Sequence, residues 1–277
     1  MEENVGMEGY SYNEMCWPEI KEVVKEKRVA ILPVGAIENH GPHLPLDADT
    51  VIVEEVCKRA AKKMEKDVAV LPVVPYGLSV HHIDFPGTIT IKVPTFTEYI
   101  QDICKSLAFH GFKYILIVNG HGGNIPSLQT VARTIVFECP GVLCMVVSWW
   151  HPKKVVDTYK NLKIYDDQGY VDHGGISETS IYMAVKPYAV NMEKATRIEY
   201  PKPEFQGLKP EEVPTEIKEQ DYYLSYWSGV TKLGNVGDPT KATVEKGEAL
   251  LNAAAQSIVD TVKALKQMKP RERVDHH

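Results

Sequence analysis

The chain has 277 residues, of which 44% are hydrophobic and 25% charged, with a net charge of −6. This composition is typical of a globular protein with a full hydrophobic core, and the acidic balance provides no basic stripe for nucleic acid. The longest apolar runs, such as 114–118 and 142–147, are too short to cross a bilayer, and the first ten residues are acidic rather than a basic signal peptide. We therefore expect a cytoplasmic protein with no nucleic-acid or membrane partner.

The five cysteines include no Cys-x-x-Cys pair, and their number is odd. Both features argue against a disulfide framework and against a thiolate zinc site. We expect most of these residues to be small members of the core.

Helices and strands are predicted to alternate along the first 150 residues. Apolar spacing predicts helices at 17–27, 51–63, 95–110 and 125–137, and strands at 28–34, 68–74, 114–118 and 142–148. Thr95 and Glu98 form a predicted capping box, and Gly111 is placed to end that helix. The repeated order of strand, polar loop and helix predicts an α/β fold with a largely parallel sheet.

Beyond residue 153 the pattern is looser. A glycine-marked loop at 172–180 is predicted to lead into a short helix, and Gly237-Asp238-Pro239 to open a final helix at 240–266. Residues 186–230 are rich in Pro, Tyr and charge, which is typical of a lid or a subunit contact. Residues 1–13 are expected to be a lead-in, and 271–277 a solvated tail whose histidines bind no metal.

Polar or aromatic residues follow each of the four predicted strands. They are Glu38 and His40, then His81 and His82, then His121, and finally Trp149, Trp150 and His151. In a parallel sheet, ligands bind outside the carboxyl ends of the strands, so we expect these side chains to line one crevice. Taken singly, each has an ordinary explanation, because strand-end histidines are often only hydrogen-bonded and tryptophans often belong to the core.

The loop after the first strand is dense in potential metal ligands. Glu38, His40, His43, Asp47 and Asp49 fall within twelve residues, and Zn²⁺ and Mn²⁺ are bound by such mixtures of carboxylate and imidazole. The alternative is a polar loop with ordinary capping carboxylates. Asp49 is also placed to cap the following helix, and the two roles can coexist.

Carboxylates and imidazoles from separate loops together suffice for a metal centre. The set consists of Glu38, His40, Asp49, His121, His173 and Glu178. Three carboxylates and three imidazoles can hold two metal ions that share a bridging carboxylate and leave one imidazole for proton transfer. The sequence therefore predicts a metal-dependent hydrolase.

The segment from Gly35 to Asp49, GAIENHGPHLPLDAD, resembles the opening metal motif of the creatininase (creatinine amidohydrolase) family. Further matches follow in the same order over residues 28–265: PYG with HH and FPGT, then NGHGGN at 119–124, HGGISETS at 173–180, and GDP at 237–239. This resemblance implies a single-domain, three-layer α/β/α sandwich with a mostly parallel sheet. It also implies assembly as a homo-oligomer, commonly a hexamer, and two divalent ions of Zn, Mn or Fe per chain.

The resemblance also implies roles for single residues. Glu38 and His121 correspond to ligands of one ion, His40 to a ligand of the other, and Asp49 to the bridge. Creatininase has a glutamate at the position of Gly123, which puts creatinine in doubt as the substrate; Glu178 is expected to supply the missing carboxylate. His173 corresponds to the residue that transfers protons. The expected substrate-binding residues are His81, His82, Trp149, Trp150, Gly122 and Gly123.

The chemistry implied is attack on a carbonyl by a hydroxide held between two ions, with His173 protonating the departing atom. We expect a small-molecule substrate, and we favour hydrolysis of a small polar cyclic amide or a related C–N bond. Two alternatives remain open. One is hydrolytic C–C ring opening of a cyclic diketone such as an inosose derivative, and the other is a metal-binding subunit without catalysis.

Overall fold

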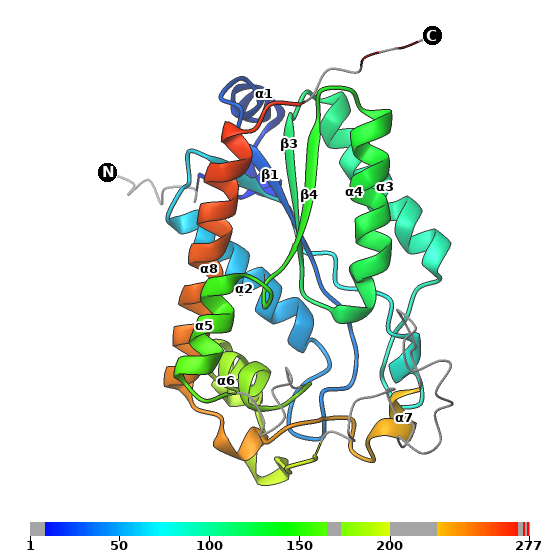
Figure 1. Cartoon of the computed structure of the whole chain (residues 1–277), viewed down its shortest axis with the longest axis vertical. Coiled ribbons are helices and arrows are strands. Elements are labelled where there is room, and N and C mark those ends of the chain that lie inside the picture. The colour runs from blue at the N-terminus through cyan, green and yellow to red at the C-terminus, as the bar shows by residue number, and fades with distance from the viewer. Residues whose placement is uncertain (1–8, 165–172, 200–225, 271–273, 275, 277) are drawn as a thin grey trace.

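Four parallel strands form one sheet in the order β2-β1-β3-β4 in this computed structural model, which describes residues 9–164, 173–199, 226–270, 274 and 276. The strands are β1 (Val29–Val34), β2 (Val68–Val70), β3 (Tyr114–Asn119) and β4 (Leu143–Ser148). β1 pairs with β3 from Ala30–Ile115 to Val34–Asn119, and β3 pairs with β4 from Tyr114–Leu143 to Asn119–Ser148. The predicted α/β class with a parallel sheet is therefore confirmed (Figure 1).

Helices cover both faces of the sheet. They are α1 (Trp17–Lys25), α2 (Ala48–Lys62), α3 (Val93–Phe109), α4 (Ile125–Glu138), α5 (Lys153–Asn161), α6 (Ile176–Val185), α7 (Trp227–Val230) and α8 (Val244–Gln267). Apolar residues of α2, α5, α6 and α8 pack on one face, and those of α1, α3 and α4 pack on the other. Figure 1 shows α2, α5, α6 and α8 on one side of the strands and α3 and α4 on the other, with α1 at the top of the view. This is the predicted three-layer arrangement.

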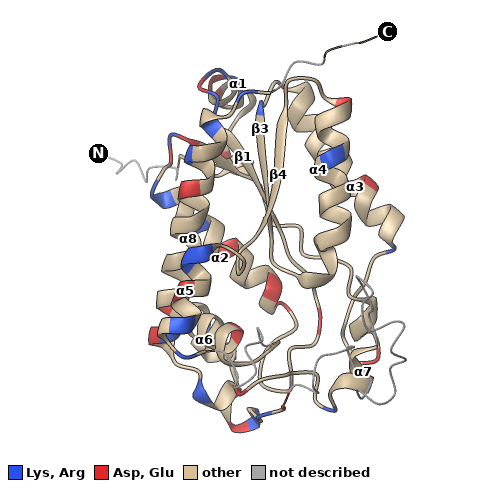
Figure 2. Cartoon of the chain, in the orientation of Figure 1, with Lys and Arg blue, Asp and Glu red and all other residues tan. Residues whose placement is uncertain are grey.

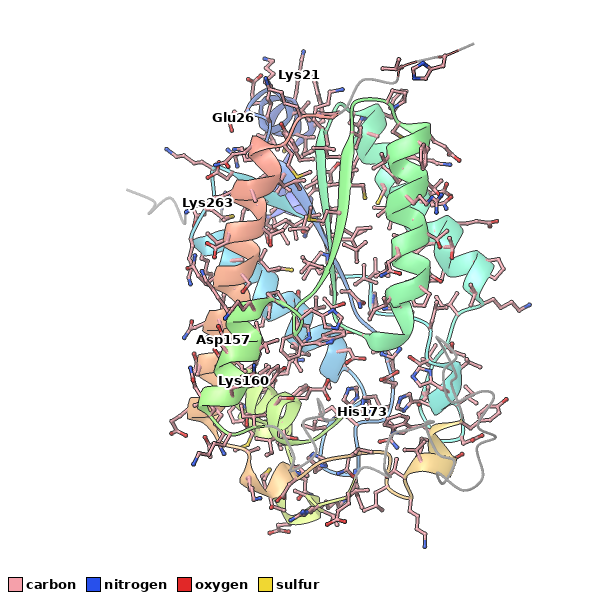
Figure 3. The ribbon with its side chains drawn as sticks, in the orientation of Figure 1. Lys21, Glu26, Asp157, Lys160, His173 and Lys263 are labelled. Atoms are coloured by element: carbon pink, nitrogen blue, oxygen red, sulfur yellow. The ribbon has the colours of Figure 1, made fainter. Side chains whose placement is uncertain are left out.

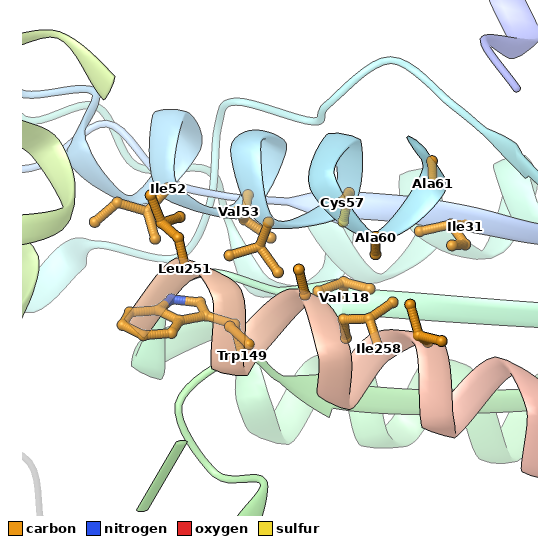
Figure 4. Packing of buried hydrophobic residues seen from close by; sticks show 14 of the residues in the cluster. Ile31, Ile52, Val53, Cys57, Ala60, Ala61, Val118, Trp149, Leu251 and Ile258 are labelled. Atoms are coloured by element: carbon orange, nitrogen blue, oxygen red, sulfur yellow. The ribbon is translucent and has the colours of Figure 1, made fainter. Parts of the chain in front are cut away.

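The sheet is apolar on both faces, as a strand covered by helices on two sides requires. In β1, Val29 and Ile31 face the α2 and α8 side, whereas Ala30 and Leu32 face the α3 and α4 side. The four strands contain no charged residue, and charge is concentrated on the outer helices and loops (Figure 2). Trp149, which follows β4, is 2% exposed and packs beside Leu251 of α8 (Figure 4).

α6 and α8 approach closely at one glycine. A methyl group on Gly247 of α8 would lie 2.0 Å from the backbone oxygen of Ser180 in α6, so no larger residue fits there. The Ser180 hydroxyl accepts a hydrogen bond from the Thr243 backbone at 3.1 Å, and the Thr243 side chain caps α8 through the Lys246 N–H. The helix that carries Glu178 is thereby fixed to the C-terminal helix.

Several predicted boundaries were wrong. The final helix begins at Val244, and Pro239 instead opens a separate 3₁₀ turn, Pro239–Lys241. α3 begins at Val93, with Lys92 at its N-cap, so Thr95 lies inside its first turn and forms no capping box. β2 ends at Val70; Val74 makes only an isolated bridge to Val34.

The predicted capping role of Asp49 was also wrong. Asp47 occupies the N-cap position of α2, and Asp49 is the second helical residue. The Asp47 carboxylate does not cap the helix, because it accepts hydrogen bonds from the Tyr182 hydroxyl at 2.7 Å and the Lys186 ammonium at 3.1 Å. Asp49 is therefore available to the interior.

Short 3₁₀ helices lie at Tyr12–Glu14, Val80–His82, Gly122–Asn124, Pro187–Ala189 and Met192–Lys194. Within the predicted excursion at 186–230, residues 186–199 contain two of these turns and 226–230 contain α7, while 200–225 lie outside the described residues. Most of the predicted tail at 271–277 also lies outside them. All five cysteines are free thiols, and no helix of the described segments has the length and apolar character needed to span a membrane.

Candidate metal centre

The loop from β1 to α2 brings Glu38, His40 and Asp49 together. The Glu38 backbone N–H donates to the Leu46 carbonyl at 3.0 Å, which folds the loop back on itself. The Thr50 hydroxyl donates to the Ala36 carbonyl at 2.9 Å and ties the start of α2 to the end of β1. Glu38, His40 and Asp49 are 1%, 0% and 2% exposed, so their polar atoms face the interior.

His121 enters the same space from the end of β3. Asn119 fixes its backbone from both sides, accepting from the His121 N–H at 3.1 Å and donating to the His121 carbonyl at 2.8 Å. The Nε2 atom of His121 lies 3.1 Å from the Leu78 carbonyl, which can only accept, so Nε2 carries the hydrogen. The lone pair of Nδ1 then points at the carboxylates.

The donor atoms of these loops converge. The two oxygens of Asp49 each face a different imidazole: Oδ1 lies 3.2 Å from His40 Nε2, and Oδ2 lies 3.2 Å from His121 Nδ1. Glu38 Oε1 also lies 3.2 Å from His121 Nδ1, and Glu178 Oε2 lies 3.6 Å from His40 Nε2. Three groups of donor atoms lie within 4.8 Å of one another: Glu38, His81 and His121; Glu38, His40 and His173; and His40, Asp49 and Glu178.

His173 lies beside this cluster, in the middle of the loops below the sheet (Figure 3). Its backbone forms a bridge with Val236, and its ring is 4.2 Å from the His40 ring. Its Nε2 atom is 2.7 Å from the Asn39 carbonyl and therefore carries the hydrogen. Nδ1 is left facing Glu38 Oε1 at 3.9 Å. The next residue, Gly174, has φ +58° and no room for a side chain, since a methyl group would lie 2.4 Å from the His40 carbonyl oxygen.

Five imidazoles around the donor cluster fall into two sets, according to whether their pKa is raised or lowered. Burial disfavours charge on His40, but Asp49 and Glu178 outweigh it and raise the pKa of His40 to about 10. Burial opposes charge on His121 too, but Glu38 and Asp49 raise its pKa well above the usual value. At the other three rings the effect of burial is larger than that of the carboxylates. It lowers the pKa of His81 to about 4 and that of His173 to about 3, and it strongly lowers the pKa of His82. Positive charge is therefore favoured at two points, beside His40 and beside His121.

The carboxylates have the complementary properties. Burial acts to raise the pKa of Glu38 and of Asp49, but His121 in the first case and His40 in the second keep both below their usual range. Glu38 Oε2 is buried without a hydrogen-bond partner among the described residues. Buried anionic oxygens of this kind need a cation nearby, so the donor set fits divalent metal ions.

A cavity of about 210 Å³ opens onto these groups. It is lined by Glu38, Asp49, Gly120, His121, Gly122, Trp149, Trp150, His173, Ser177 and Glu178. Trp149, Trp150 and Gly122 thus lie where a substrate could touch them, whereas Gly123, His81 and His82 are outside this lining. Gly123 is tightly packed, because a methyl group there would lie 2.3 Å from the Leu78 oxygen and 2.5 Å from His121 Nε2.

Two residues near the site have no role in the sequence-based prediction. Trp227 of α7 packs its ring 5.2 Å from His173 and 5.1 Å from His82, and its indole N–H donates to the Gly234 carbonyl at 2.8 Å. Trp227 lies near the end of the predicted excursion at 186–230, whose sequence has no helical or strand periodicity from which its position could be predicted. Ser177 lines the cavity and adjoins Glu178 in the sequence, a proximity that could have drawn attention to it.

Comparison with known proteins agrees with this geometry. Residues 13–262 match the Creatininase family model, described as creatinine amidohydrolase. The chain is 27% identical over 262 residues to creatinine amidohydrolase of Pseudomonas putida, covering 90% of this chain and 95% of that protein. It is 29% identical over 239 residues to a mycofactocin precursor peptide peptidase of Mycolicibacterium smegmatis (85% and 84%), and 30% identical over 199 residues to 3-dehydro-scyllo-inosose hydrolase of Thermotoga maritima (69% and 61%).

Solved structures show the same relationship. A manganese form of creatininase superposes with a TM-score of 0.75 at 26% identity, covering 92% of this chain and 97% of that one. A creatininase point variant of zinc-zinc type gives 0.74 at 26% identity with the same coverage. Fold, donor set and relatives together define a metal-dependent hydrolase. The chain belongs to the creatininase family, as its motifs predicted.

Proposed function

We propose that this protein is a two-metal hydrolase acting on a small polar cyclic amide. Glu38 and His121 would hold a first ion, His40 and Glu178 a second ion, and Asp49 both. The observation that carries the proposal is the position of Asp49, whose two oxygens each lie 3.2 Å from a different imidazole. A carboxylate placed between two nitrogen donors is the arrangement that a bridging ligand requires.

Glu178 supports the second half of this assignment. Its Oε2 atom accepts a hydrogen bond from the Gly174 N–H at 2.6 Å and lies 3.6 Å from His40 Nε2, so the carboxylate is held toward the centre. The position at which creatininase has a glutamate is Gly123, where a side chain would collide with the Leu78 carbonyl. Glu178 therefore supplies the third donor that an ion beside His40 and Asp49 needs.

His173 is assigned to proton transfer. The Asn39 carbonyl holds its Nε2–H, which orients Nδ1 toward the cavity as the atom that takes up and releases a proton. Burial lowers the pKa of His173, so the ring is neutral near neutral pH and Nδ1 carries a lone pair rather than a proton. When bound, the two ions supply Lewis-acid polarisation of a carbonyl and a water of lowered pKa.

The cavity favours a small substrate. Its volume of about 210 Å³ is below the roughly 300–1,000 Å³ of pockets that enclose drug-sized ligands. Its lining combines the polar side chains of the centre with the indole of Trp150, which suits a flat polar ring. A peptide chain would need a longer groove.

The test is a substrate panel assayed on protein loaded with Zn²⁺ or Mn²⁺, with the bound metal counted by elemental analysis. The panel contains cyclic amides including creatinine, a formamidopyrimidine and an inosose-type diketone. We expect close to two ions per chain and turnover of a cyclic amide, with creatinine a poor substrate. Turnover of the diketone alone would replace the C–N assignment by C–C cleavage, and two ions without any turnover would favour the non-catalytic subunit.

A matched variant tests the ligand assignment. Glu178→Gln keeps the size of the side chain and one oxygen that can accept the Gly174 N–H, but removes the negative charge. We expect it to lose the second ion and nearly all turnover while the first ion stays bound. A fully active Gln variant with two ions would refute the role of Glu178.

A further inference from the structure

One buried imidazole of the first motif has no part in the proposed chemistry. His43 is 1% exposed and lies three residues after His40. Its Nε2 atom is 3.0 Å from the hydroxyl of Thr179, the residue that follows Glu178. His43 belongs to none of the groups of converging metal donors among the described residues.

We propose that His43 is a positioning residue that aims Glu178 at the second ion through Thr179 and Gly174. This inference rests on the proposed function, in which Glu178 is a ligand. It assigns a role to His43, which lies in the ligand-rich loop after β1 but is not a member of any of the donor groups described above.

The contact runs through a short chain of hydrogen bonds. The Thr179 hydroxyl donates to the Gly174 carbonyl at 3.4 Å, and the Gly174 N–H donates to Glu178 Oε2 at 2.6 Å. Gly174 itself packs against the His40 backbone so closely that no side chain fits. His43 therefore contacts Thr179 at one end of the turn 174–179, and Gly174 at the other end binds the Glu178 carboxylate.

The direction of the hydrogen bonds follows from the proton count. Thr179 has a single O–H, which it donates to Gly174, so the Nε2 of His43 must be the donor to Thr179. His43 Nδ1 is buried without a partner among the described residues. In the Nε2–H tautomer this atom is an acceptor with a lone pair. The opposite tautomer would bury an N–H without a hydrogen-bond partner, which is unfavourable.

The same contact joins two loops that are far apart in the sequence. His43 lies in the loop before α2, and its carbonyl accepts the Asn191 N–H at 2.9 Å. Thr179 lies in the first turn of α6. Because His40 comes from the first loop and Glu178 from the second, their relative position depends on what connects the loops. Groups that orient a metal ligand in this way typically change metal affinity by 10–100-fold when removed.

The experiment measures the affinity of each ion separately, by titrating metal-free protein with Zn²⁺ against a chromophoric chelator. His43→Phe keeps the ring but removes its donors, and Thr179→Val keeps the shape but removes the hydroxyl. We expect each to weaken the second ion by roughly 10–100-fold and to leave the first unchanged. Thr179→Ser and His43→Gln, which retain a hydroxyl and an N–H donor, should recover most of the affinity.

A double variant separates positioning from general packing. If His43 acts through Thr179, His43→Phe combined with Thr179→Val should weaken the second ion no more than either change alone. Wild-type affinity for the second ion in both single variants, equal weakening of both ions, or additive losses would each overturn the inference.

Glu178→Gln provides the reference for the proposed function. If that variant loses the second ion whereas the His43 and Thr179 variants keep it, the positioning role is wrong but the ligand assignment stands. If Glu178→Gln itself retains both ions at wild-type affinity, the proposed function fails at this residue.

Discussion

Two adjacent glycines of the NGHGGN motif at 119–124, Gly122 and Gly123, provide a sharp test of the site geometry. An alanine methyl at Gly123 would lie 2.3 Å from the Leu78 oxygen and 2.5 Å from His121 Nε2, whereas at Gly122 it would meet nothing within 4 Å. Neither glycine has a positive φ, so backbone strain does not distinguish them. The same substitution should therefore give opposite results one residue apart.

The magnitudes follow from the two contacts. Forcing an extra methyl group into a packed site costs about 1–3 kcal/mol of stability. Replacing glycine by alanine also stabilises the fold by about 0.4–1 kcal/mol, because it lowers the conformational entropy of the unfolded chain. The difference between these ranges is about 0–2.6 kcal/mol. Because the closest contact, at 2.3 Å, is with a backbone oxygen that cannot rotate away, we expect Gly123→Ala to be destabilised by an amount in the upper half of this range, which lowers the melting temperature by several degrees for a chain of this size. It should also weaken the first ion, because the 3.1 Å contact between His121 Nε2 and the Leu78 carbonyl is displaced.

Gly122→Ala is the matched control. It should melt at or slightly above the wild-type temperature and keep both ions, but raise KM, because the methyl group enters the cavity. Thermal melts followed by circular dichroism, combined with the chelator competition, measure both effects. A Gly123→Ala protein that melts like wild type and keeps its first-ion affinity would refute the packing argument.

Three further outcomes are expected. His173→Ala should keep both ions and lose about 10²–10⁴-fold in kcat, as is typical for a missing general acid or base, and loss of an ion would reassign it as a ligand. A chelator should abolish turnover but leave the far-ultraviolet circular dichroism intact, since the three apolar clusters contain none of the proposed ligands. If the chelator unfolds the protein, the metals have a structural role instead. Burial lowers the pKa of His43 to about 4, so the unfolded chain binds this proton more readily below pH 6.5. The stability contributed by neutral His43 is present above pH 6.5 and is lost as the pH falls toward 4. Between these pH values the melting temperature of His43→Phe should therefore fall less steeply than that of the wild type. Parallel plots of melting temperature against pH for the two proteins would contradict the assignment of a neutral His43.

The sheet and the strand-end site could be predicted because both depend on local patterns. Apolar runs bounded by glycine and proline mark β1, β3 and β4, and parallel strands place their carboxyl ends at one edge. That rule alone brings His121 to Glu38, 83 positions earlier in the chain. In the structure Glu38 Oε1 lies 3.2 Å from His121 Nδ1, while the ligand roles that the family motif implied stay a prediction.

The errors come from contacts between residues distant in sequence. Asp47 is the N-cap of α2 by position, but Tyr182 and Lys186 occupy its carboxylate, and neither is visible in a local motif. The final helix starts later than Pro239 suggests because Thr243 caps it. Trp227 reaches His173 from 54 positions away through a segment without periodicity, so only the folded structure reveals the contact.

The close approach of α6 and α8 at Gly247 has a consequence for synthesis of the protein on the ribosome. Glu178 stands on α6, and α6 packs against a helix that begins only at Val244. A nascent chain that has emerged as far as residue 200 already contains all the proposed ligands, yet lacks the helix against which α6 docks. At about 5–20 residues per second, several seconds separate the appearance of the ligands from that of their support. During this interval neither α6, which carries Glu178, nor α2, which carries Asp49, has the helix against which it packs, so the proposed ligand set reaches its final arrangement only after α8 has been made.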